Sequence, residues 1–81
     1  MSAIPVHMIE ESVDSIKQIL TIKTDLKEVG PAVLVPVEDN DDKVILNSYH
    51  TGGDVVVKMK VITFPAKKFN KGDKIAYAVL L

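Results

Sequence analysis

The chain of 81 residues contains no cysteine, no tryptophan and no arginine. Without cysteine there is no disulfide to stabilise the fold, and two histidines by themselves cannot complete a structural zinc site. No apolar run of about 18 residues occurs, which argues against a membrane-spanning helix, and the N-terminus lacks the features of a secretory signal. We therefore expect a cytoplasmic protein of one domain, residues 1–81, for which oligomerisation is the remaining route to extra burial.

The missing arginine limits the chemistry, because all ten basic residues are lysine. Arginine offers a planar fork that binds phosphate through two hydrogen bonds and reads guanine, whereas lysine is a point charge. Sequence-specific DNA binding and phosphate cleavage are both disfavoured. No nucleophile elbow, phosphate loop or metal-ligand spacing is found either. We therefore assign no catalytic residue, metal ligand or cofactor, and the preferred interpretation is a protein that is not an enzyme.

The charges that are present are unevenly distributed along the chain. Residues 1–54 carry ten acidic residues and four lysines, whereas residues 55–81 carry six lysines and a single aspartate. This polarity is consistent with attraction between subunits, or with a basic surface for phosphate or for an acidic protein. Ordinary solvated charge on strand faces explains it at least as well.

The N-terminal part allows two interpretations. Apolar residues at three- and four-residue spacing, with acids early and a lysine late, predict a helix over residues 8–20. The β-favouring segment 19–24 predicts instead a strand that starts inside that range. We expect residues 1–25 to form a short N-terminal helix or arm, followed by a β core over residues 26–81.

From Gly30 onward the periodicity is that of strands. The clearest alternation places four apolar residues on one face and Lys58 and Lys60 on the other. The acidic turn that precedes the second strand lacks the glycine and the distal glutamate of a calcium loop, so we interpret it as solvated. The fold class is mainly β, a small jelly-roll-like barrel or sandwich. The predicted strands cover residues 31–37, 43–46, 54–64 and 74–81, with turns or loops at 38–42, 48–53 and 70–73.

Two groups of residues are candidates for binding a ligand. The first lies in the loop that ends in a pair of glycines, which either let a backbone approach a ligand or form a tight turn. The second is a lysine-rich segment around Phe69. It forms either a basic and aromatic patch for single-stranded nucleic acid or a charged hairpin tip that resists edge pairing. The candidate ligand residues are Tyr49, His50, Gly52, Gly53, Lys71 and Lys74.

The stretch from Val44 to Leu81 resembles the later half of the dUTPase and dCTP-deaminase superfamily. The matching residues are a loop that ends in Gly53, the strand 54–57, and the turn and strand 69–76. The resemblance implies a jelly-roll-like fold and a homotrimer whose subunits share clefts. The family's acidic nucleoside-reading position, its arginine-serine-glycine segment and its glycine-rich C-terminal arm have no counterpart here. The resemblance therefore implies the fold and the trimer rather than the activity.

Three functions from different classes are consistent with these observations. The leading hypothesis is a non-catalytic oligomeric module, preferably a trimer, that self-assembles or binds a partner protein. A small structural or accessory protein of a bacteriophage, virion-associated, fits that description. The second hypothesis is a nucleotide-binding protein with a cleft between subunits. The third is a minimal dUTPase-type hydrolase with magnesium held by Asp54 or Asp73.

Overall fold

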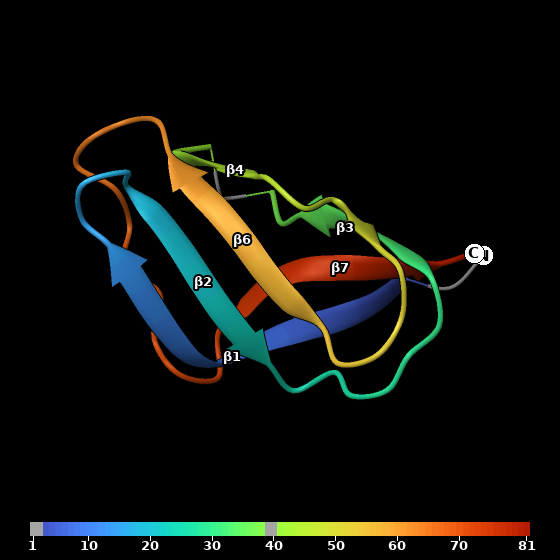
Figure 1. Ribbon diagram of the computed structural model, residues 1–81. Helices are drawn as coiled ribbons and strands as arrows, with labels where there is room; N and C mark the ends of the chain where they lie inside the picture. The colour runs from blue at the N-terminus through green and yellow to red at the C-terminus, as the bar shows by residue number, and fades with distance from the viewer. Residues whose placement is uncertain (1–2, 39–40) are drawn as a thin grey trace.

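The computed structural model describes residues 3–38 and 41–81, and the regular structure within these ranges consists entirely of β-strands. The strands are hydrogen-bonded in the order β4-β6-β2-β1-β7-β3-β5, and the pairs are antiparallel. Figure 1 shows that the sheet curls on itself into a half-barrel. The described ranges contain no helix long and apolar enough to cross a membrane. The strands are β1 (Ala3–Asp14), β2 (Ile19–Thr24), β3 (Ala32–Pro36), β4 (Lys43–Ile45), β5 (Tyr49–His50), β6 (Val56–Val61) and β7 (Lys74–Leu80).

Strand β1 joins the two halves of the sheet. Its first part, residues 3–7, pairs with β7, and its second part, residues 8–14, pairs with β2. Register shifts after Val6 and after Met8 mark bulges, which bend a strand and increase its twist. The bend is visible in Figure 1, where the blue strand changes direction between its two parts. We call the first part of β1 with β7, β3 and β5 half-sheet A, and the second part with β2, β6 and β4 half-sheet B.

The hydrophobic core lies inside the curl, between the inner faces of the two half-sheets. On β6, Val57, Met59 and Val61 are buried, while the lysines between them are exposed. The buried hydroxyl of Thr24 donates a hydrogen bond of 2.7 Å to the carbonyl of Val55, so this polar group in the core is satisfied. The core residues are Val6, Met8, Leu20, Ile22, Ala32, Leu34, Val55, Val57, Met59, Val61, Phe69, Ile75, Ala76 and Ala78.

The helix predicted over residues 8–20 is wrong, because this segment forms the end of β1, a tight turn and the start of β2. Asp14 Oδ1 accepts the backbone N–H groups of Ile16 and of the next residue, both at 3.1 Å, and Gln18 has a φ of 58°. Val13 and Ile16, counted on the apolar face of the helix, are 58% and 92% exposed. Pairing with distant strands overrides the local spacing. The alternative, a strand that starts within this range, is confirmed by β2.

The mainly-β fold class is confirmed, and β3, β4, β6 and β7 lie within the predicted strands. Residues 3–24 are part of the same sheet rather than an arm ahead of it. Strand β5 was not predicted, since it lies in the expected loop 48–53. It pairs only with the first two residues of β3, so Pro36, which lacks an N–H, lies beyond its end. The predicted acidic turn at 38–42 falls partly outside the described residues.

Candidate functional site

The first group of predicted ligand residues forms a tight turn beside β5. The His50 ring is buried, and its Nε2 lies 3.0 Å from the carbonyl oxygen of Gly53. Gly53 also exchanges two backbone hydrogen bonds with Val29, at 2.9 and 3.1 Å. Gly52 and Gly53 have φ values of 141° and 90°, a region that favours glycine. The structure therefore agrees with the interpretation that these two glycines form a turn.

The second group lies at the opposite end of half-sheet A. Lys74 begins β7, and its Nζ donates to the Tyr77 hydroxyl at 2.7 Å and lies 4.8 Å from the centre of that ring. Lys71 is exposed in the preceding turn. His50 pairs with Ala32, which pairs with the far end of β7, so the six steps along that strand separate the two groups by about 20 Å. One copy of the chain does not bring the six residues into a single site.

The outward side of half-sheet A is a continuous apolar surface, which sequence reasoning missed. Cross-strand partners lie on the same side of a sheet. One row consists of Ala3, Val79, Val33 and Tyr49 in adjacent strands, and a second row contains Tyr77 between its neighbours on β1 and β3. We call this surface outer face A. Its members are Ala3, Pro5, Val33, Val35, Tyr49, Tyr77 and Val79, none of which is charged, and all are half-buried or exposed.

Along residues 76–79 of β7, alanines face the core and larger side chains face outward. Ala76 and Ala78 of β7 are fully buried, while Tyr77 and Val79 between and after them are half-buried. The partly buried apolar residues that pack against the core, namely Leu26, Val29, Ile45 and Ala66, come from elsewhere in the described chain.

A sequence signal for this surface does exist. Strands that are covered on both sides read as continuous apolar runs rather than as alternation. Residues 31–37 and 75–81 are such runs. In the structure only one side of these strands packs against the core, so their second apolar side is left as outer face A.

The outward side of half-sheet B differs in that charged and polar side chains predominate, although Ile19, Val44 and Val56 also lie on it. Lys23 and Glu10 are cross-strand partners whose Nζ and Oε2 atoms lie 3.5 Å apart. Lys60 donates from Nζ to the carbonyl oxygen of Lys17 at 2.8 Å, and Lys58 is exposed beside it. The charged and polar residues of this surface, outer face B, are Glu10, Ser12, Asp14, Thr21, Lys23, Lys58 and Lys60.

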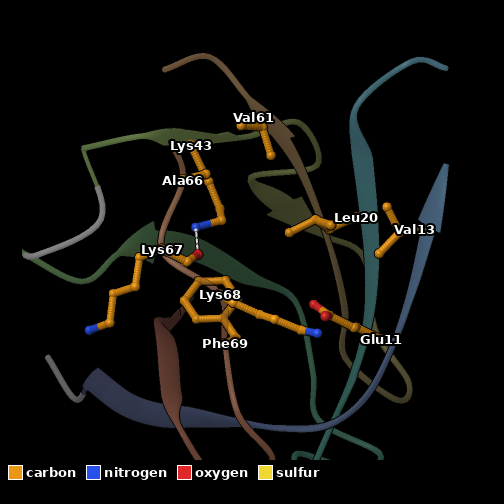
Figure 2. Close-up of a pocket in the computed structure, with 9 residues that line it drawn as sticks. All are labelled: Glu11, Val13, Leu20, Lys43, Val61, Ala66, Lys67, Lys68 and Phe69. Carbon is orange, nitrogen blue, oxygen red and sulfur yellow. Dashed lines mark hydrogen bonds between the residues drawn. The ribbon is translucent and has the colours of Figure 1, made fainter. Parts of the chain in front are cut away.

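A pocket of about 170 Å³ opens where the β1–β2 hairpin faces the segment between β6 and β7. Figure 2 shows Leu20 and Val13 on one side of it and Phe69 and Lys43 on the other. We call it the open-end pocket. It is lined by Glu11, Val13, Leu20, Lys43, Val61, Ala66, Lys67, Lys68 and Phe69.

One wall of the open-end pocket is fixed by a buried lysine. The side chain of Lys43 is 2% exposed, and its Nζ lies 3.1 Å from Asp42 Oδ1 and 4.5 Å from the centre of the Phe69 ring. It also donates to the carbonyl oxygen of Lys67, whose N–H in turn donates to Asp42 Oδ2. This N–H lowers the pKa of Asp42 most, burial opposes it, and the Lys43 ammonium adds to the lowering. The buried charge is therefore neutralised locally, as burial requires.

A second ionisable pair lies where β1 passes from one half-sheet to the other. His7 donates its backbone N–H to Asp25 Oδ1 at 2.9 Å, and its Nδ1 lies 2.9 Å from Oδ2. Burial raises the pKa of Asp25, but the bonds from the His7 backbone and ring outweigh that effect and leave the pKa lowered. Within residues 3–38 and 41–81, no three acidic or histidine side chains converge in a way that could hold a metal ion.

No family model, no curated protein and no solved structure matches this chain. The resemblance to the dUTPase and dCTP-deaminase superfamily consequently stays a prediction. The surfaces and the pocket described above are the basis for the function proposed below.

Proposed function

We propose that this protein is a non-catalytic association module that pairs with a second copy of itself through outer face A. The observation that carries the proposal is the predominantly apolar surface on the second side of strands whose first side already packs against the core. Exposed apolar surfaces of this kind mark sites of interaction with other proteins. Covering the surface removes its side chains from water and stabilises the pair.

A second copy suits outer face A better than a charged partner does. The charge beside this surface is confined to its edge, where the Lys74 ammonium donates to the Tyr77 hydroxyl. The rest is complementary to itself because apolar side chains meet apolar side chains about a two-fold axis. Two twisted sheets pack face to face about 10 Å apart. The net charge of −1 adds little repulsion between copies.

The size of the surface sets the expected strength. The strand segments of half-sheet A are 5 (β1), 7 (β7), 5 (β3) and 2 (β5) residues long. At a strand spacing of about 4.8 Å they cover roughly 300 Å² in projection. Two copies together bury on the order of 600 Å², which is below the approximately 1,200 Å² of standard interfaces. We therefore expect a reversible dimer whose population depends on concentration. The homotrimer implied by the family resemblance is the competing stoichiometry.

The test is sedimentation equilibrium on the full chain from about 1 µM to 1 mM, at low and at high sodium chloride. We expect the mass to rise from one copy toward two, and the dissociation constant to stay constant or fall at high salt, because apolar contacts are not screened. A limiting mass of three copies would replace the dimer with the trimer. A single-copy mass at every concentration would reject self-association.

A further inference from the structure

The open-end pocket combines an apolar interior with two opposite charges at its mouth. Val13, Leu20, Val61, Ala66 and Phe69 form the interior walls. Glu11 and Lys68 line the same pocket from different segments. Figure 2 shows the Lys68 side chain reaching across the mouth toward the Glu11 carboxylate, whereas Lys67 points away. The mouth thus presents one anion and one cation at the entrance to an apolar cavity.

The two mouth charges are available to a ligand. Among the described residues, the Glu11 carboxylate and the Lys68 ammonium form no ion pair with each other within 4.0 Å. The charge inside the wall is already satisfied, since Lys43 is bound to Asp42 and to the Lys67 carbonyl. The bonds of Asp42 and Lys43 to the Lys67 backbone also fix the segment from which Lys68 projects.

We propose that the open-end pocket binds a free α-amino acid with an apolar side chain. The side chain would occupy the cavity, the α-carboxylate would bind Lys68, and the α-ammonium would bind Glu11. A cavity of about 150 Å³ is large enough for benzene, so the 170 Å³ found here accommodates the side chain of leucine or phenylalanine. A residue within a peptide loses at least one of the two backbone charges, which is why the free amino acid is the better match.

The pocket is separate from the proposed dimer surface. It lies between the inner side of half-sheet B and the segment that follows β6, and none of its lining residues belongs to outer face A. The amino-acid site therefore does not rest on the proposed function, and either one can fail without the other.

The experiment is a titration of the ¹⁵N-labelled protein with L-leucine, followed by amide chemical shifts. Three analogues dissect the contacts: isocaproate lacks the ammonium, isopentylamine lacks the carboxylate, and glycine lacks the apolar side chain. We expect leucine to shift amides around Val13, Leu20 and Phe69. Isocaproate and isopentylamine should bind about two- to fivefold more weakly, because exposed ion pairs contribute modestly. Glycine should give no saturable shift.

Three variants locate the site on the chain. Lys68→Gln and Glu11→Gln should each weaken leucine binding by about two- to fivefold, and Ala66→Leu should fill the cavity and abolish binding. Lys58→Gln makes the same charge change on outer face B and should leave binding unchanged. If Ala66→Leu loses its dispersed amide spectrum, the two charge variants decide the outcome.

Several results would overturn the proposal. One is equal binding of leucine and isocaproate, since the ammonium would then have no role. Another is unchanged binding in Lys68→Gln and Glu11→Gln, and a third is the absence of saturable shifts with leucine. Shifts at the pocket on raising protein concentration alone would assign it to a second copy instead.

Discussion

The two outward sides of this curled sheet differ in character although they belong to one continuous set of strands. Outer face B carries cross-strand ion pairs such as Lys23 with Glu10, and lysines alternate with buried residues along β6. Outer face A has valine, tyrosine, proline and alanine in the corresponding places. Solvent contact suits the first face and contact with protein suits the second. An alternating strand pattern therefore indicates a side that faces solvent, whereas a continuous apolar pattern indicates a side suited to contact with protein.

Placing a charge on each face is the strongest test of the difference between outer face A and outer face B. Val79→Glu puts a carboxylate in the centre of outer face A, where pairing would bury it without a partner. We expect self-association to weaken by roughly a hundredfold or more, since an uncompensated buried charge costs several kcal/mol. Sedimentation velocity measures the change. Thr21→Glu, at a half-buried strand position on outer face B, is the control. If Thr21→Glu lost the dimer while Val79→Glu remained dimeric, outer face B rather than outer face A would be the dimer surface.

The converse test makes outer face B apolar. The double variant Lys58→Val with Lys60→Val extends the apolar character of β6 to its outward side. We expect new association through half-sheet B and hence species larger than a dimer, with at least about tenfold tighter apparent assembly. Light scattering at fixed concentration detects these species. Lys58→Gln with Lys60→Gln removes the same charges without apolar gain, and larger species in that variant would make charge loss the cause.

Truncating one aromatic ring tests the difference between the two faces without adding charge. Tyr77→Ala removes a large side chain from the middle of outer face A, and aromatic residues dominate the energetics of interfaces. We expect the dimer dissociation constant to rise by about tenfold, the effect of roughly 1–2 kcal/mol. Lys23→Ala on outer face B is the counterpart and should change the constant by less than about twofold. Equal effects of the two truncations, measured by isothermal dilution calorimetry, would contradict a localised surface.

The smallest effect that we expect is a loss of stability at acidic pH. It involves one carboxylate at the junction of the half-sheets and one next to β4. The pKa values of Asp25 and Asp42 are both lowered below 3.8 in the folded chain. Each carboxylate therefore stabilises the fold above pH 3.8, and this contribution disappears as the pH falls through the folded pKa. We expect the free energy of unfolding to drop on acidification below about pH 4. Asp25→Asn and Asp42→Asn should each make that drop shallower in urea titrations. An unchanged pH slope in both would show that other carboxylates dominate.

The sequence predicted the β core well, because its signals are local. Lys58 and Lys60 alternate with buried residues, and a turn with Gly72 precedes the last strand, so the positions of β6 and β7 could be predicted. The N-terminal hairpin could not, since Val13 and Ile16 follow helical spacing and only distant pairing makes them strand and turn. The six predicted ligand residues divide between two ends of half-sheet A, a separation that depends on which strands pair. The open-end pocket, too, is assembled from three separate segments.

The pairing of β1 with β7 has a consequence for how the chain acquires its structure. Ala3 lies opposite Val79, so β1 pairs with a strand that is synthesised much later than itself. Closing such a long loop costs conformational entropy before any contact compensates it, and folding slows as contacts become more distant in sequence. Half-sheet A therefore cannot form cotranslationally while residues 74–80 are still inside the ribosome. A nascent chain halted before Lys74 should remain protease-sensitive, whereas one that exposes Leu80 should become resistant.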